Sequence, residues 1–112
     1  MPTYEVAAAP FPYVERPVRQ RRPCLIVGRP EGGHELVWVL MITSAGNARL
    51  AGDVDIPDLD SAGLRAASVV RTAKIATVGL HDLRVIGRLS GPVAAAVRDH
   101  MDRWHERADT GA

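Results

Sequence analysis

The sequence of 112 residues has one cysteine, one lysine and no apolar run that approaches the length of a membrane-spanning segment. A single cysteine cannot form an internal disulfide bond. Cys24 lies within a short apolar run, which favours a small buried hydrophobic side chain. The N-terminus has an early Glu5 and no basic start, so it does not resemble a signal peptide. These absences predict a cytoplasmic protein that does not enter a membrane.

The positive charges are almost all arginines, and charges of both signs are unevenly spread along the chain. Lys74 is the only lysine, so nearly every positive charge is a guanidinium, which binds phosphate through planar, bidentate contacts. A basic segment favours an anionic partner, with a solvated arginine-rich loop as the alternative. An acidic segment lacks the spacing of a calcium loop, so we expect solvated carboxylates, with a loop over residues 58–63, and no metal site there. The basic segment contains Arg16, Arg19, Arg21 and Arg22, and the acidic segment contains Asp53, Asp55, Asp58 and Asp60.

Short β-favouring segments between glycine, proline and polar turns predict a mainly β protein, a small barrel. The run over residues 36–42 lacks alternation, which is typical of a strand buried on both faces, and Trp38 is expected in the core. Residues 14–20 are predicted to form a charged loop and residues 58–63 a turn. The predicted strands span residues 4–9, 23–27, 36–42, 53–56, 67–71, 75–78 and 84–89.

The segment after Leu89 predicts one C-terminal helix, because its apolar residues recur at helical spacing. This apolar face is expected to pack in the core or in a dimer. The last residues have little to bury and should fray. We therefore expect one domain over residues 1–106 and a frayed tail over residues 107–112. The apolar face of the helix comprises Val93, Val97, Met101 and Trp104.

Groups that bind phosphate flank two of the predicted strands. Arg22 stands directly before the strand that Pro23 opens, and the strand over residues 36–42 is followed by Thr43 and Ser44. If these two strands are neighbours, the guanidinium and the two hydroxyl groups face one cleft. Such a cleft would suit a phosphate group.

Five motifs follow one another along nearly the whole chain. They are APFPY (residues 9–13), RRPCLIV (21–27), ITS (42–44), ASVVRTAKIAT (67–77) and IGRLS (86–90). In this order they resemble the PemK/MazF family of toxins from bacterial type II toxin–antitoxin systems. The resemblance implies an SH3-like β-barrel, a homodimer, a partner antitoxin, and cleavage of single-stranded RNA at short sequences without a metal or other cofactor. In that family the RNA's own 2′-hydroxyl attacks the adjacent phosphate and leaves a 2′,3′-cyclic phosphate.

The resemblance also implies roles for four residues. The family's arginine before the strand-opening proline matches Arg22, and its threonine at the end of the central strand matches Thr43, with Ser44 beside it. An arginine that follows a Val-Val pair matches Arg71, for which an ion pair with the acidic segment is an equal alternative. Fixed donors stabilise the charge that develops on a reacting phosphate, so Arg22 would act electrostatically and Thr43 would donate a hydrogen bond.

RNA contacts outside this cleft are predicted for four residues of the N-terminal part. Phe11 and Tyr13 would stack an unpaired base, and Arg19 and Arg21 of the basic segment would hold the backbone.

The chain departs from the family at one position. Some members carry a carboxylate two residues beyond the arginine that matches Arg71, where it serves as general base. That position is Ala73 here, so the base is unassigned, and His34 and Glu15 are the remaining candidates.

Two alternatives to the ribonuclease therefore stay open. The first is a weak or inactive member that binds antitoxin or RNA, which Ala73 supports. The second is a gyrase poison with the same barrel. Arg22 and Thr43 argue against it, because a protein-binding poison needs no phosphate clamp.

Overall fold

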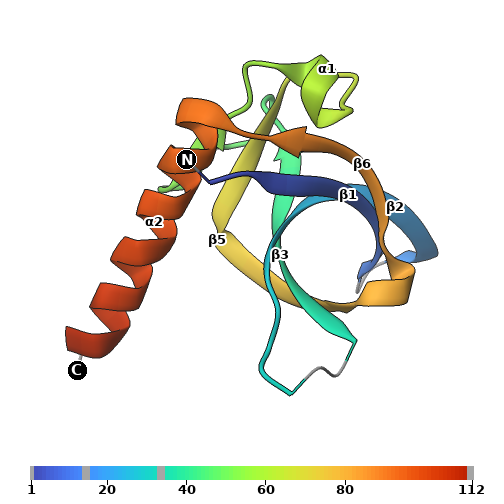
Figure 1. The fold of residues 1–112 in the computed structure, drawn as a ribbon. Coiled ribbons are helices and arrows are strands. Elements are labelled where there is room, and N and C mark those ends of the chain that lie inside the picture. The colour runs from blue at the N-terminus through green and yellow to red at the C-terminus, as the bar shows by residue number, and fades with distance from the viewer. Residues whose placement is uncertain (1, 14–15, 33–34, 111–112) are drawn as a thin grey trace.

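In the part of the chain that the structure describes, six antiparallel strands form one curled sheet and a long helix packs beside it (Figure 1). The computed structural model describes the backbone of residues 2–13, 16–32 and 35–110, and the side chains of these residues except 11–20 and 105–110. A mainly β fold with a C-terminal helix is thereby confirmed. The elements are β1 (Tyr4–Tyr13), β2 (Arg16–Gly28), β3 (Leu36–Ser44), β4 (Asp53–Asp55), α1 (Leu59–Ala62), β5 (Ser68–Gly79), the 3-10 turn η1 (Leu80–Asp82), β6 (Arg84–Leu89) and α2 (Gly91–Thr110).

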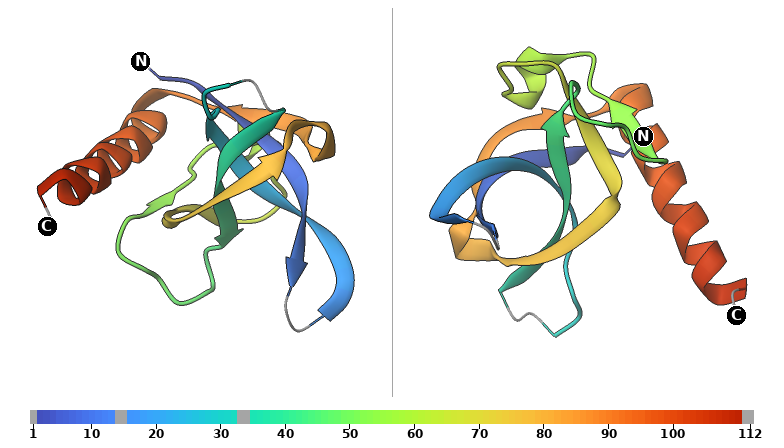
Figure 2. Two further views of the ribbon diagram at one scale, coloured as in Figure 1. Left: turned by 90° about the horizontal axis from the view of Figure 1, so that it is seen from below. Right: turned by 180° about the vertical axis from the view of Figure 1, so that it is seen from behind.

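The sheet curls because its pairing is interrupted. The strand order is β4-β5-β3-β2-β1-β6, and the register shifts within four of the five strand pairs. Such bulges bend the strands and increase their twist. The result is the ring of strands seen in Figure 1 and in the right-hand view of Figure 2. Strands β4 and β6 form the two edges of the described sheet, and α1 lies against β6.

Both faces of the central strands bury apolar side chains. Leu25 and Leu40 belong to one cluster, which Val97 of α2 joins. Cys24 and Val39, which directly precede those two strand residues, belong to a second cluster. Successive residues of a strand point to opposite faces, so β2 and β3 contribute to both clusters. This double burial explains why their sequences are almost continuously apolar.

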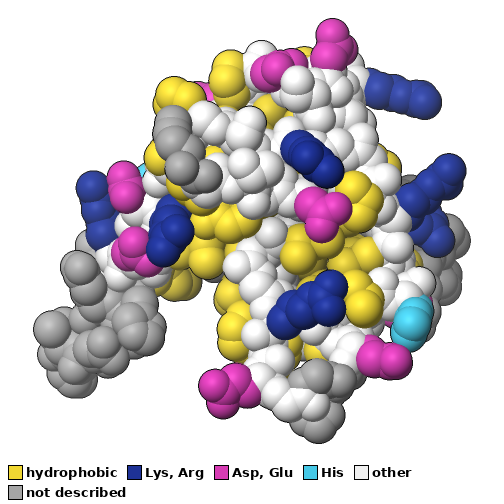
Figure 3. Space-filling view, in the orientation of Figure 1, with side chains coloured by type: hydrophobic (Ala, Val, Ile, Leu, Met, Phe, Trp, Pro, Cys, Tyr) yellow, Lys and Arg dark blue, Asp and Glu magenta, His cyan; other side chains and the backbone are white. Residues whose placement is uncertain are grey.

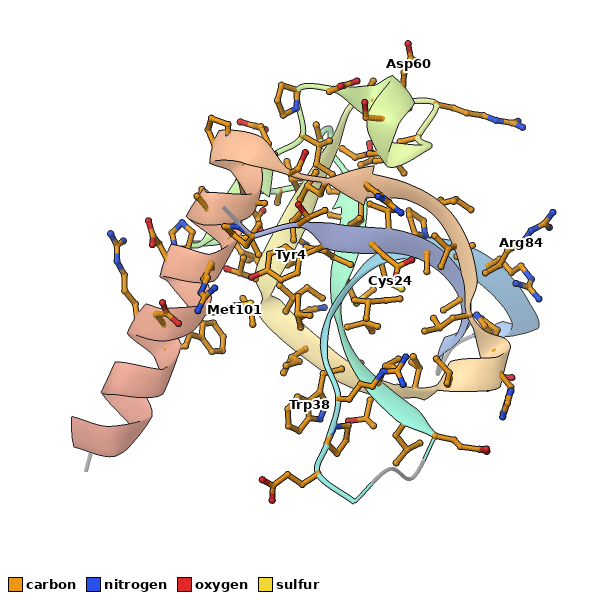
Figure 4. The ribbon with its side chains drawn as sticks, in the orientation of Figure 1. Tyr4, Cys24, Trp38, Asp60, Arg84 and Met101 are labelled. Atoms are coloured by element: carbon orange, nitrogen blue, oxygen red, sulfur yellow. The ribbon has the colours of Figure 1, made fainter. Side chains whose placement is uncertain are left out.

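Cys24 is fully buried in the second cluster, and its side chain lies within the ring of strands (Figure 4). Burial raises the pKa of the thiol to about 11, so the group stays protonated at neutral pH. The prediction of a small buried hydrophobic side chain is confirmed.

The loop predicted over residues 14–20 is wrong for residues 16–20, which belong to β2. Residues 14 and 15 lie outside the described part. Arg22 consequently lies in the interior of a strand of 13 residues, and not at a strand entrance. Pairing with β1 extends the strand through this charged segment, where local sequence favours a loop.

Strand β1 continues past Pro10, where the sequence predicted its end, as far as Tyr13. Pro10 pairs with Arg21 of β2, whereas β6 pairs with β1 only up to Ala8. Pro10 therefore lies where β1 has a neighbour on one side only. Proline is tolerated at such an edge because no second strand needs its missing N–H.

Strand β5 joins two segments that the sequence predicted as separate strands. Arg71 pairs with Met41 and Ile75 pairs with Leu40, so the residues between Arg71 and Ile75 form an irregularity within one continuous strand. The burial of β3 also differs from the prediction, because Trp38 is 40% exposed and is not a core residue.

Helix α2 buries Val97 and turns Met101 toward the sheet (Figure 4). Trp104 is 45% exposed, so the predicted apolar face is buried only in part. Hydrophobic side chains reach the surface between α2 and the sheet (Figure 3), where Ile75, Met101 and Trp104 line a hollow of about 190 Å³. No helix in the described ranges is long and apolar enough to cross a membrane. The division into a domain over residues 1–106 and a tail over residues 107–112 stays a prediction.

The segment predicted as a turn over residues 58–63 contains the short helix α1. The backbone N–H of Ser61 donates to Asp58 Oδ1 at 3.1 Å, and the Ser61 hydroxyl donates to Oδ2 at 2.6 Å. Gly63 ends the helix with φ of 72°. An aspartate cap at the start and a left-handed glycine at the end are ordinary helix boundaries, and here they lie close enough to define a single turn.

Gly87 of β6 packs against the backbone of α1. A Cβ atom there would lie 2.3 Å from the carbonyl carbon of Ala62 and 2.6 Å from the carbonyl oxygen of Ser61. We therefore expect Gly87→Ala to lower the free energy of unfolding in urea by about 1–3 kcal/mol. Gly46→Ala is the control, because its Cβ would meet nothing closer than 3.6 Å. Its stability should be unchanged or slightly raised, and equal losses in both variants would contradict the packing argument.

Candidate functional site

Arg22 and Thr43 lie on one face of the sheet and toward the same end of neighbouring strands. Cys24 of β2 pairs with Met41 of β3. Arg22 and Thr43 each lie two residues beyond this pair, in the same direction because the strands are antiparallel. Residues two apart in a strand share a face. The condition for the predicted cleft, that these two strands are neighbours, is confirmed.

A tight turn follows Thr43 and engages its hydroxyl group. The side-chain amide of Asn47 donates to Thr43 Oγ1 at 2.7 Å. The backbone N–H of Asn47 donates to the Ser44 carbonyl at 3.1 Å, and the backbone N–H of Gly46 donates to Ser44 Oγ at 3.2 Å. Thr43 is 9% exposed and Ser44 is exposed. The Ser44 hydroxyl thus helps to hold the turn, and its predicted catalytic role stays a prediction.

Arg71 shares the face of Thr43 but is engaged by β4. It pairs with Met41 on one side and with Asp53 on the other. Its Nε and Nη2 donate to the Asp53 carboxylate at 3.2 and 3.0 Å, and Nη2 also donates to the Ala48 carbonyl at 2.7 Å. The ion pair with the acidic segment, which the sequence left as an alternative for Arg71, is therefore present, and a catalytic role stays a prediction.

The Arg71–Asp53 pair is shielded from solvent, with side-chain exposures of 13% and 1%. Burial raises the pKa of Asp53, but hydrogen bonds from Arg71 and the Leu50 N–H, with the charges of Arg71 and Arg49, bring it below its ordinary value. The hydrogen bond to Asp53, followed by its charge, raises the pKa of Arg71. Both groups are charged at neutral pH, and each offsets the cost of burying the other.

The structure separates the predicted RNA-binding residues. Phe11 pairs with Gln20 at the far part of the β1–β2 hairpin, where Tyr13 and Arg19 also lie; the side chains there are outside the described set. Arg21 lines a surface pocket of about 540 Å³ with residues that follow α1. Adjacent strand residues face opposite ways, so Arg21 lies on the other face of β2 from Arg22.

Ala73, the position of the missing carboxylate, lies on β5 two residues beyond Arg71 and thus past the Asp53 end of β4. Ala73 lines a pocket of about 430 Å³ together with His100 and Arg103 of α2. His34 and Glu15, the remaining candidates for a general base, lie outside the described residues. Among the residues that are described, no three His, Cys, Asp or Glu side chains form a group that could hold a metal ion.

Sequence reasoning missed two residues that shape this site. Asn47 lies between the predicted strands over residues 36–42 and 53–56, and only its turn-favouring type, three residues after Ser44, signalled its role. Asp53 was placed on the predicted strand over residues 53–56, within the acidic segment that was the alternative partner of Arg71. The two residues are 18 positions apart, so no local pattern singled out Asp53.

Both the fold and the sequence of this chain are similar to those of known proteins. The fold is similar to that of the Mycobacterium tuberculosis toxin MazF-mt6, with a TM-score of 0.68 and 25% sequence identity over 91% of this chain and 96% of that chain. Residues 3–104 match the family described as PemK-like, MazF-like toxin of type II toxin-antitoxin system. The chain belongs to this family, and the resemblance seen in the sequence is confirmed. A comparison with curated proteins finds no match.

Asp53→Ala tests how far the buried ion pair stabilises the fold. Removing one partner of such a pair generally costs about 3–5 kcal/mol, and we expect a loss at the lower end because Arg71 keeps some access to solvent. The loss is measured by unfolding in urea. Asp55→Ala is the matched control, since its pair with Arg49 is 69% and 52% exposed, and should cost much less. Losses of the same size would show that burial of the pair is unimportant.

The pH dependence of the same pair follows from the lowered pKa of Asp53, whose ordinary value is 3.8. A lowered pKa in the folded state adds stability that is fully present above the unfolded value and is lost as the pH falls through the folded value. The difference in unfolding free energy between wild type and Asp53→Asn should therefore stay constant from neutral pH to about pH 4 and shrink below it. A difference that already shrinks near pH 6 would contradict this assignment.

Proposed function

We propose that this protein is an endoribonuclease toxin that cleaves single-stranded RNA at short sequences, without a metal ion. The family to which the chain belongs is known for endoribonuclease activity. The observation that carries the proposal is the position of Arg22 and Thr43 on one face and at one end of neighbouring strands. A guanidinium and a hydroxyl so placed can offer a phosphate group both positive charge and a hydrogen bond.

The proposed reaction is an internal transesterification of RNA. The 2′-hydroxyl oxygen loses its proton and bonds to the adjacent phosphorus, while the bond from phosphorus to the 5′ oxygen breaks and that oxygen takes up a proton. The products are a 2′,3′-cyclic phosphate and a 5′-hydroxyl. Since the attacking oxygen belongs to the RNA, the protein has to supply position and charge and not a nucleophile. This is why the proposal calls for no metal ion.

Arg22 acts in this proposal as an electrostatic clamp on the phosphate. A guanidinium transfers protons poorly near neutral pH, whereas a fixed positive charge stabilises the extra charge on the phosphoryl oxygens in the transition state. Thr43 donates a hydrogen bond from its hydroxyl group to the same phosphate, with Ser44 beside it. Arg71 contributes mainly by holding Ala48 and Asp53 in place, because its donors already have these partners.

The remaining parts of the proposal concern partners and location. Phe11, Tyr13 and Arg19 of the β1–β2 hairpin are assigned to RNA binding, and Arg21 to a part of the RNA that reaches the other face of β2. A homodimer, a cognate antitoxin and a cytoplasmic location follow from the family. The exposed Ile75 offers apolar surface to a protein partner. Antitoxin segments that order on binding use such surfaces at an entropic cost.

A second candidate function is a weakly active or inactive binding module. Two observations favour it: Ala73 supplies no titratable group where some members carry a carboxylate, and the guanidinium of Arg71 is taken up by Asp53. Such a protein would bind RNA or antitoxin without turnover.

The deciding experiment is cleavage of a mixed-sequence single-stranded RNA by antitoxin-free protein in EDTA. Wild type should produce fragments that end in a cyclic phosphate. Arg22→Ala should lower the rate by about 10²–10³-fold, as for the loss of one preorganised donor to a transition state. Mass spectrometry of the fragment ends checks the chemistry, and gel densitometry checks the rate.

Arg88→Ala provides the matched control, because Arg88 is an exposed arginine on the edge strand β6, opposite Glu5. It should cleave RNA at the wild-type rate. Absence of cleavage by folded wild type would overturn the ribonuclease proposal and favour the binding module, which RNA binding without turnover would then support. Cleavage that stops in EDTA would overturn the metal-independent chemistry.

A further inference from the structure

We propose that Asn47 is a positioning residue that directs the hydroxyl proton of Thr43 toward a bound phosphate. The inference rests on the proposed function and deepens it. It begins with the hydrogen bond of 2.7 Å in which the Asn47 side-chain amide donates to Thr43 Oγ1. Neither the sequence motifs nor the family match assigns a role to Asn47.

The chemistry of a hydroxyl group makes this contact directional. Threonine has one O–H donor and two acceptor positions. When the oxygen accepts from Asn47, its proton cannot point at the amide nitrogen, because two protons would then face each other. The proton is left for a group on another side. Thr43 lies toward the same strand end and on the same face as Arg22, so a phosphate held by Arg22 is the acceptor that the site would supply.

Asn47 is itself held by the backbone on both sides. Its own N–H closes the turn on the Ser44 carbonyl at 3.1 Å. The carbonyl of the next residue, Ala48, accepts from Arg71 Nη2 at 2.7 Å, and Arg71 is fixed in turn by the buried carboxylate of Asp53. The donor that orients Thr43 is thus preorganised before RNA binds, which is the condition for a strong effect on a transition state.

An acidic residue at this position would reverse the contact. Aspartate has nearly the shape of asparagine but, when ionised, only acceptor oxygens. In Asn47→Asp the Thr43 hydroxyl would therefore donate to the new carboxylate, and its proton would be withdrawn from the phosphate. Asn47→Ala would only leave the hydroxyl free to rotate. The two variants therefore distinguish a directed proton from a merely filled space.

The first test is a double-mutant cycle on the rate of RNA cleavage in a single turnover. Asn47→Ala should lower the rate by about fivefold, the effect of one neutral hydrogen bond. Asn47→Asp should lower it by about 10²-fold, like the loss of a transition-state donor. In a Thr43→Ala background Asn47→Ala should have almost no effect and Asn47→Asp an effect at least fivefold smaller, because the group through which Asn47 acts is gone. Equal effects in the two backgrounds would overturn the inference.

The second test reads the contact without any cleavage. The chain has one asparagine and one glutamine, Gln20, so its side-chain amides give only two pairs of NMR signals. Thr43→Val should shift the Asn47 pair, and Arg88→Ala, on the edge strand β6 far from the turn in the strand order, should not. Unchanged Asn47 signals in Thr43→Val would overturn the inference.

The two tests separate a failure of this inference from a failure of the proposed function. If wild type cleaves RNA but the cycle shows no coupling, Asn47 has no positioning role and the ribonuclease stands. If the NMR contact is present but wild type neither cleaves RNA nor binds a 2′-O-methyl single-stranded RNA, the proposed function fails, and the positioning of a phosphate donor fails with it. Coupling in the double-mutant cycle together with a shift of the Asn47 signals in Thr43→Val supports the inference.

Discussion

The register that pairs β3 with both of its neighbours is the constraint on which the rest of the structure depends. Residues on this register form one row that crosses the whole described sheet. Antiparallel partners that stand opposite each other share a face, so the row fixes which side chains meet. The row consists of Val85, Ala7, Cys24, Met41, Arg71 and Asp53. Its central part is apolar and its β5–β4 end is a shielded ion pair. Arg22 and Thr43 lie two residues further along their own strands.

A slip of one residue in this register would reverse both the core and the site. Leu40 and Ile42, now buried with Leu25, would turn to the face of Cys24. Thr43 would turn away from Arg22 at the same time. Because the central strands are apolar on both faces, alternation of polarity does little to select the register. The Arg71–Asp53 pair and the bulge between Leu40 and Met41 select it instead, since each fits one alignment only.

The sequence predicted the fold class and the C-terminal helix, because apolar runs bounded by glycine and proline are local signals. It left the adjacency of the Arg22 and Thr43 strands only as a condition, which the strand order meets. It failed where pairing between distant segments decides the outcome. Residues 16–20 are charged and contain a proline, yet they extend along β1. Trp38 looks like a core residue by type, but the described elements leave it 40% exposed. The hydrogen bond from Asn47 to Thr43 joins residues only four apart, but the sequence did not predict it either. The direction of the Asn47 side chain depends on the backbone geometry of the turn, which composition does not specify.

The ion pair between Arg71 and Asp53 determines what Arg71 can contribute to the proposed site. A shielded guanidinium requires a counter-charge, and Arg71 obtains one across the strand pair, from Asp53 of β4. This arrangement changes the electrostatics of the face that Arg71 shares with Thr43. Since Asp53 offsets the charge of Arg71, the proposed reaction assigns the electrostatic contact with the phosphate to Arg22. What Arg71 contributes is geometric, because the same guanidinium fixes Ala48 and so the turn that carries Asn47. The proposal thus assigns charge to Arg22 and orientation to Arg71, which lie on the two strands that flank β3.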